Sequence, residues 1–150
     1  LAAHPDIVKA VSKIQSQETS APSSISQAAG VAAYTNDLSE VEKMREQFSK
    51  RRDFMVESLN AIDGVSCFTP GGAFYVFPDI SSFLGTKTAD GKVMETSTDL
   101  CLYLLDEFGL AVVPGDAFGE PNGLRMSYAA SIEDLEEAMD RFKKGLATLS

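Results

Sequence analysis

The side chain with the clearest chemical potential is an arginine inside a strand pattern. In Leu124-Arg125-Met126-Ser127-Tyr128 apolar and polar residues alternate, so the apolar residues share one face of a strand and Arg125 and Ser127 share the other. A guanidinium in such a place either forms a structural ion pair with one of the chain's 22 acidic residues or faces a cleft as a carboxylate clamp. The spacing alone favours the ion pair.

Two further segments could contact a ligand. Pro114-Gly115-Asp116-Ala117-Phe118-Gly119 follows an apolar run, and glycines on either side of an aromatic residue let a loop pack closely around a ligand. An ordinary turn has the same composition. The serine-rich stretch 16–26, which Pro22 interrupts, could likewise be a polar connector between helices.

Composition excludes several classes of protein. The chain has 150 residues, 44% of them hydrophobic and 23% charged, which is typical of one globular domain. Its formal net charge of −9 leaves no general basic face for nucleic acid. No apolar run approaches the roughly 20 residues of a membrane span. We therefore expect neither a nucleic-acid partner nor a membrane partner.

Metal and thiol chemistry also have little support. His4 is the one histidine, so we expect no metal site and no histidine-based triad. Cys67 and Cys101 each lie in an apolar run outside any CxxC spacing, which favours two buried free thiols over a disulfide. Free thiols are typical of a reducing compartment, and we expect a cytoplasmic protein.

The elements that must position these residues follow from apolar periodicity and from helix-capping residues. Helices are expected from Pro5 to before Ser16 and across 28–33, the second with a cap at Ser23 or Ser24. Further helices are expected across 38–62, from a cap at Ser97 or Thr98 to Gly109, and from a capping box at 131–134 onward. Strands are expected at 65–68, 73–77, 110–113 and 123–129, with a mobile polar excursion at 81–95. This order indicates an α+β fold, in which helices cover a small, mainly antiparallel sheet.

Three motifs occur along the chain in a particular order and spacing. They are Pro70-Gly71-Gly72-Ala73-Phe74-Tyr75, Val113-Pro114-Gly115-Asp116-Ala117-Phe118-Gly119 and Gly123-Leu124-Arg125-Met126-Ser127-Tyr128. Together they resemble the C-terminal part of a class I, fold-type I, pyridoxal-phosphate aminotransferase. The opening segment, with Gln15-Ser16-Gln17 and Ser23-Ser24-Ile25-Ser26-Gln27, resembles the bacterial-type aspartate and prephenate aminotransferases in particular. The resemblance covers nearly all of the chain.

The resemblance implies a domain organisation and roles for individual residues. Residues 37–150 would form the small C-terminal domain, and residues 1–36 would form a helix–loop–helix segment that leads from a large cofactor-binding domain. Arg125 would bind the α-carboxylate of an amino-acid or 2-oxo-acid substrate. Ser20, Ser23 and Ser24 would belong to a loop that approaches the active site near the interface of a homodimer.

The lysine that forms the Schiff base with the cofactor has no match in this chain. In the family it is followed closely by Gly-x-Arg-x-Gly and lies just upstream of Gly-Tyr-Leu-Ala-Ala, whose end Leu1-Ala2-Ala3 matches. Neither Ser12-Lys13 nor Ser49-Lys50 has that context. We therefore expect the catalytic lysine and the main grip on pyridoxal 5′-phosphate to lie upstream. The isolated chain is expected to bind no cofactor and to be inactive.

Three functions remain open on the sequence. The first is the C-terminal part of an enzyme that transfers an amino group between an amino acid and a 2-oxo acid, with aspartate, glutamate or prephenate as substrate types. The second is a non-catalytic module in which Arg125 holds a carboxylate metabolite. The third is a structural domain that mediates dimer contacts.

Overall fold

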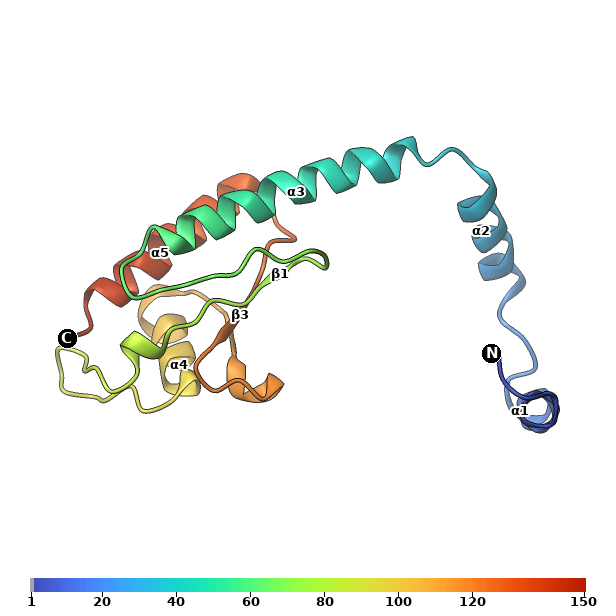
Figure 1. Cartoon of the computed structure of the whole chain (residues 1–150), viewed down its shortest axis with the longest axis horizontal. Helices are drawn as coiled ribbons and strands as arrows, with labels where there is room; N and C mark the ends of the chain where they lie inside the picture. Colours follow the sequence, from blue (N-terminus) through green and yellow to red (C-terminus); the bar gives the residue numbers. More distant parts are fainter. Residues whose placement is uncertain (1) are drawn as a thin grey trace. The chain divides into compact units, whose positions relative to one another are not determined.

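The computed structural model describes residues 2–150, which divide into two units on either side of the Glu40–Val41 bond. Leu1 lies outside the described residues, and so does its part in the proposed match of Leu1-Ala2-Ala3. The first unit holds helices α1 (Pro5–Glu18) and α2 (Ser24–Thr35) (Figure 1). Neither helix buries a single residue.

Pro5 opens α1 as predicted, because the fixed φ of proline suits the first helical turn. The predicted end before Ser16 is wrong, because α1 continues to Glu18. The helix stops where Ser20 takes a positive φ of 61° and its N–H donates to the carbonyl of Gln15 at 2.8 Å. The predicted N-cap position of α2 at Ser23 is confirmed, although the Ser23 hydroxyl makes no capping hydrogen bond.

The second unit contains the sheet and its covering helices. Its elements are the greater part of α3 (Ser39–Asn60), then β1 (Tyr75–Val76), the 3₁₀ turn η1 (Ser81–Phe83), α4 (Ser97–Phe108), β2 (Val113–Pro114), the 3₁₀ turn η2 (Gly115–Phe118), β3 (Leu124–Ser127) and α5 (Ile132–Ala147). The three strands are antiparallel in the order β1-β3-β2. The predicted α+β class, with a small antiparallel sheet and helices, is confirmed.

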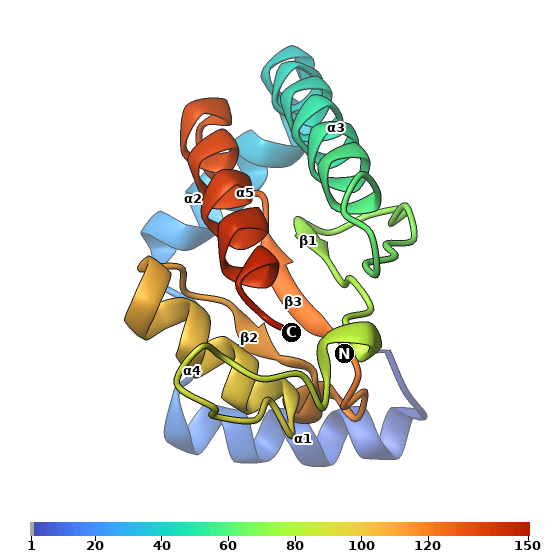
Figure 2. The ribbon, with the colours of Figure 1, turned by 90° about the vertical axis from the view of Figure 1, so that its left-hand side faces the viewer.

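Helices α3 and α5 run side by side, and α5 also packs on α4 (Figures 1 and 2). Gly145 of α5 permits the second contact, because a Cβ atom there would lie 2.6 Å from the Leu104 side chain. One apolar core joins α3, α4, α5 and the sheet. Most of the apolar stripe predicted for the last helix is buried in it, namely Leu135, Met139, Phe142 and Leu146.

The sheet confirms the predicted division of β3 into two faces. Leu124 and Met126 are buried in the core, Arg125 is half-buried and Ser127 is exposed. The strands themselves are shorter than predicted. Residues 65–68 form only an isolated antiparallel bridge between Ser66 and Asp79, and β1 begins at Tyr75 because Ala73 has a positive φ of 61°.

The start of α4 differs from the prediction by one residue. Thr96 is the N-cap, and it forms a capping box in which the Asp99 N–H donates to the Thr96 hydroxyl at 3.1 Å and the Thr96 N–H donates to the Asp99 carboxylate at 2.9 Å. Ser97, one of the two predicted caps, is fully buried instead. The predicted end is confirmed, because Gly109 closes the helix with a φ of 62°.

Segment 81–95, for which a mobile polar excursion was predicted, is anchored at several points, and its mobility stays a prediction. Ile80 and Met94, which bound most of this segment, are both fully buried in the core. Between them, the Gly85 N–H donates to the Met94 carbonyl at 2.8 Å, and Lys87 exchanges two backbone hydrogen bonds with Ser150. The polar composition of the segment conceals these apolar and backbone anchors.

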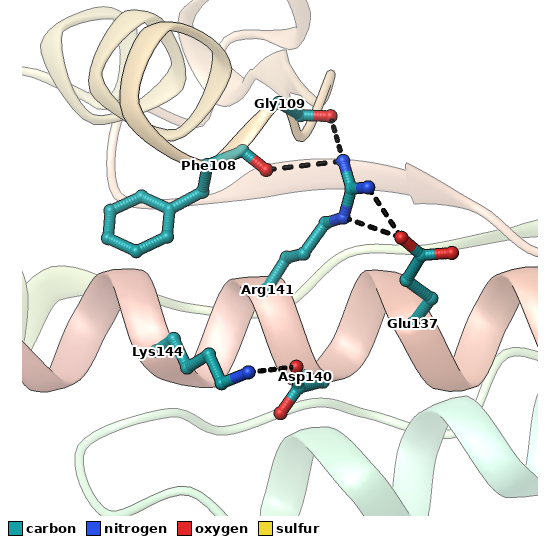
Figure 3. A network of polar contacts seen from close by, with 6 residues as sticks. All are labelled: Phe108, Gly109, Glu137, Asp140, Arg141 and Lys144. Carbon is teal, nitrogen blue, oxygen red and sulfur yellow. Dashed lines mark hydrogen bonds and ion pairs between the residues drawn. The ribbon is translucent and has the colours of Figure 1, made fainter.

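Arg141 of α5 ties that helix to the end of α4, as Figure 3 shows. Its guanidinium donates to the carbonyl oxygens of Phe108 and Gly109 at 3.3 and 2.9 Å. Carbonyls at a helix C-terminus have no partner within the helix and carry partial negative charge, so a cation stabilises them. Glu137, one turn earlier on α5, pairs with the same guanidinium at 2.5 Å.

Both cysteines are free and buried, which confirms the sequence prediction. Burial raises the pKa of both thiols above the ordinary value of 9.0, and that of Cys101 to about 12. Among the helices of residues 2–150, none combines the length and the apolar character that crossing a membrane requires.

Candidate functional site

Arg125 lies on β3, between β1 and β2, and its side chain rests against aromatic rings. Its guanidinium carbon is 4.4 Å from the centroid of the Tyr75 ring and 4.6 Å from that of the Phe118 ring. Phe77 meets Phe118 edge-on, with centroids 6.0 Å apart and planes at 88°. We call Tyr75, Phe77 and Phe118 the aromatic cradle.

The cradle is assembled by the sheet rather than by sequence proximity. Tyr75 is on β1, where its backbone lies opposite Ser127 of β3. Phe118 ends the η2 turn, which follows β2 directly, and β2 pairs with β3 so that Val113 lies opposite Arg125. The strand order β1-β3-β2 therefore brings a ring of β1 and a ring of the turn after β2 to the arginine of the central strand.

The segment that leads into Tyr75 is held by Tyr128, the residue that follows β3. The Tyr128 hydroxyl donates to the carbonyl of Ala73 at 2.9 Å, and its N–H donates to the carbonyl of Phe74 at 2.9 Å. Tyr128 is buried, and burial raises the pKa of its phenol. These bonds secure the Gly-Gly-Ala segment, in which Ala73 has a positive φ.

The turn that carries Phe118 is held by close backbone packing. The Gly115 N–H donates to the carbonyl of Gly123 at 2.9 Å, and a Cβ atom at Gly115 would overlap the carbonyl oxygens of Glu120 and Gly123. The buried Ser97 hydroxyl donates to the carboxylate of Asp116 at 3.3 Å, which links the turn to the start of α4. Gly115 therefore permits close packing of the turn against the chain's own backbone, and not against a ligand.

The ion pair that the spacing of Arg125 favoured is not formed within the described chain. Across residues 2–150, the ion pairs of arginines involve Arg45, Arg52 and Arg141, and none involves Arg125. The half-buried guanidinium of Arg125 meets rings instead, and rings do not neutralise its charge. A planar guanidinium without a carboxylate partner can bind an external carboxylate through two parallel hydrogen bonds.

The serines singled out from the sequence belong to the first unit, whereas Arg125 belongs to the second. Ser20 lies between α1 and α2, Ser23 is the N-cap of α2 and Ser24 is its first residue, and all three are exposed. Their proposed place near an active site stays a prediction.

The surroundings of Arg125 do not fit a complete pyridoxal-phosphate site. The groups described in contact with its guanidinium are the rings of Tyr75 and Phe118, and rings offer no amine for a Schiff base. Lys13 is on α1 and Lys50 is on α3, both exposed. Within residues 2–150, no group of three or more histidine, cysteine, aspartate or glutamate side chains could hold a metal ion.

Comparison with known proteins identifies the family. The model of the family "Aminotransferase class I and II" matches residues 1–142. The chain belongs to the class I and II aminotransferases. An aspartate aminotransferase from Rhizobium meliloti (strain 1021) is 47% identical over 145 residues, which are 97% of this chain and 35% of that protein. A bifunctional aspartate aminotransferase and glutamate/aspartate-prephenate aminotransferase from Petunia hybrida is 46% identical over 95% of this chain and 30% of its own length.

Solved aminotransferase structures have the same fold. The crystal structure of the aspartate aminotransferase from Rhizobium meliloti matches 97% of this chain and 36% of its own, with a TM-score of 0.92 and 46% identity. The aspartate aminotransferase from Thermotoga maritima matches 95% of this chain and 33% of its own, with a TM-score of 0.76 and 37% identity. The chain thus spans about a third of the length of the aminotransferases it matches.

Proposed function

We propose that this chain is the C-terminal part of a pyridoxal-phosphate-dependent aminotransferase that transfers an amino group between an amino acid and a 2-oxo acid. Family membership supports the reaction class. The names of the relatives support aspartate, glutamate and prephenate as substrate types. Residues 37–150 are the small domain in this proposal, and residues 1–36 lead from the large domain.

The observation that carries the proposal is the state of Arg125. Its guanidinium is half-buried, belongs to the central strand of the sheet and has no ion-pair partner among residues 2–150. The α-carboxylate is the anion that every amino-acid and 2-oxo-acid substrate shares. We therefore assign the binding of this carboxylate to Arg125.

In this assignment Arg125 orients both substrates of the exchange in the same way. A bidentate guanidinium–carboxylate pair restrains distance and direction together, so the Cα atom of the amino acid and the carbonyl carbon of the 2-oxo acid take one position in turn. Closure of the small domain over the substrate would exclude water and strengthen this pair. We assign no contact with pyridoxal phosphate to this chain, and we propose that the Schiff-base lysine and the main grip on the cofactor lie upstream of it.

The first unit supports the proposal of a longer protein. Its helices bury no residue, although they carry large apolar side chains that are 41–94% exposed, namely Ile7, Val11, Ile14, Ile25, Val31 and Tyr34. Amphipathic helices draw most of their stability from packing such faces against another surface. We propose that the large domain and a second subunit of a homodimer supply this surface. Ser20, Ser23 and Ser24 would then lie near that interface.

The experiment that tests the function joins this chain to the coding sequence upstream of it and measures amino transfer with added pyridoxal phosphate. Aspartate and glutamate are offered as donors, and 2-oxoglutarate, oxaloacetate and prephenate as acceptors. Transfer between at least one pair supports the proposal. A folded, cofactor-loaded protein that binds dicarboxylates and transfers no amino group would instead be a non-catalytic carboxylate-binding module. The buried free cysteines support a cytoplasmic location for the proposed enzyme.

A further inference from the structure

We propose that Phe118 and Tyr75 are positioning residues, which hold the Arg125 guanidinium by cation–π contact and keep its N–H donors available to the substrate carboxylate. The inference rests on the proposed role of Arg125 and assigns the means by which the arginine is held. Its basis is the geometry of the aromatic cradle.

The distances place both rings in cation–π contact with Arg125. The guanidinium carbon lies 4.4 and 4.6 Å from the two ring centroids, inside the roughly 6 Å within which such contacts stabilise a cation. A ring that stacks on a guanidinium leaves the in-plane N–H groups free for hydrogen bonds. An aspartate or glutamate partner would occupy those same N–H groups and compete with the substrate.

Phe118 does not fill the core of its own unit. Its side chain is 49% exposed, whereas the neighbouring apolar residues Leu124 and Met126 of β3 are at most 4% exposed. Phe118 nevertheless has a restrained place, because Phe77 braces it edge-on at 6.0 Å. Within this unit the Phe118 ring therefore adds little to the buried core, and its described ring contacts are with Arg125 and Phe77.

The two rings are fixed independently of each other. Tyr75 is placed by pairing of β1 with β3 and by the Tyr128 hydrogen bonds to the preceding segment. Phe118 is placed by the η2 turn, which Gly115 and the bond from Ser97 to Asp116 hold against β3 and α4. The arginine is thus oriented before any substrate arrives, which lowers the ordering cost of binding.

The test compares Phe118→Leu with Phe68→Leu in the enzyme assembled with its upstream sequence. Leucine removes the π-face and keeps an apolar side chain. Phe68 is 87% exposed and lies outside the cradle, so its variant is the matched control.

We expect Phe118→Leu to raise KM about fivefold or more for the amino acid and the 2-oxo acid alike, as loss of one cation–π contact predicts. The kcat should change by less than about twofold, because orientation of the bound carboxylate serves ground and transition states alike. Phe118→Tyr should restore KM.

A double-mutant cycle separates positioning from a structural role. In an Arg125→Gln background, where the cation is absent, Phe118→Leu should leave KM unchanged. An equal rise of KM in both backgrounds, failure of Phe118→Tyr to restore binding, or an unchanged KM in Phe118→Leu overturns the inference. If Phe118→Leu does not fold, KM is measured for Tyr75→Leu instead, in both backgrounds, and judged by the same criteria.

The same data distinguish this inference from the proposed function. If Arg125→Gln alone leaves every KM unchanged, the assignment of Arg125 as carboxylate ligand fails, and the positioning role fails with it. If Arg125→Gln raises KM and neither ring variant does, only the positioning inference fails.

Discussion

The Arg125 guanidinium is half-buried and forms no ion pair with any other residue of 2–150. Buried charges in proteins are usually paired with an opposite charge, and the chain has 22 acidic residues that could have supplied one. The described contacts of Arg125 are instead with the rings of Tyr75 and Phe118. The alternation of residues 124–128 predicted the face on which Arg125 lies. Of its two aromatic partners, however, Tyr75 is 50 residues upstream and Phe118 is seven residues upstream. Their approach depends on the strand order, which no local pattern reveals.

The thiol of Cys101 carries a prediction about pH. Burial raises its pKa to about 12 in the folded chain, above the ordinary value of 9.0. The unfolded chain therefore loses this proton first as pH rises, so stability from the neutral thiol is complete below about pH 9 and declines toward pH 12. We expect the free energy of unfolding in urea to fall between pH 9 and 10.5.

Cys101→Ala identifies the contribution of this group. The variant is less stable at pH 7 because it leaves a small cavity, but its free energy of unfolding should fall less steeply above pH 9. The largest slope that one such group can contribute is about 1.4 kcal/mol per pH unit. Identical slopes for the two proteins would show that Cys101 does not titrate in the way its burial implies.

At the scale of elements, helices and turns differ in how far the sequence predicts them. The apolar stripe and the Ser131 cap of α5 are local features, and both are confirmed. The anchors of segment 81–95 were not predicted because Ser150 and the core residues that it contacts are remote in sequence. The strand predicted at 73–77 begins only at Tyr75 because Ala73 takes a positive φ, which an alanine rarely signals in advance.

The junction of α4 and α5 predicts a difference between two substitutions. Arg141→Ala removes hydrogen bonds to the carbonyls of Phe108 and Gly109, so we expect the free energy of unfolding to fall by about 1–2 kcal/mol. Glu137→Gln removes only a solvent-exposed ion pair and should cost less than about 0.5 kcal/mol. Urea denaturation of both variants measures the difference. Equal losses would mean that the exposed pair, and not the helix end, accounts for the role of Arg141.

The packing of the η2 turn predicts that alanine is not tolerated at Gly115, in contrast to Gly71, which lies outside this turn. A Cβ atom at Gly115 would overlap two backbone carbonyl oxygens, so Gly115→Ala should force the turn to move and cost about 1–3 kcal/mol. Gly71 has nothing within 4 Å of such an atom, so Gly71→Ala is the control and should be close to neutral. Thermal unfolding of both variants tests this. A normal melting temperature for Gly115→Ala would show that the turn is not held as tightly as its hydrogen bonds indicate.

At the scale of the whole molecule, the two units should differ in local stability. Helices α1 and α2 contain no buried residue, whereas α5 has five buried residues. In the isolated, monomeric chain we expect amides of residues 4–34 to exchange with solvent rapidly and those of α5 to be strongly protected. Hydrogen exchange resolved by residue measures both. Strong protection of residues 4–34 in a monomer would show that these helices need no further surface.

The central claim is that Arg125 binds the carboxylate common to all substrates, and Arg125→Lys in the protein extended by its upstream sequence tests it most directly. Lysine keeps the charge but loses the planar fork, so kcat/KM should fall by the equivalent of about 2–4 kcal/mol. The loss should be the same for every amino donor and 2-oxo acid, while overall stability stays nearly unchanged. Arg45→Lys, at an exposed arginine paired with Glu42, should leave the kinetics as they are. If Arg125→Lys instead unfolds much of the protein and the remaining folded enzyme is fully active, Arg125 is a structural residue and the account is wrong.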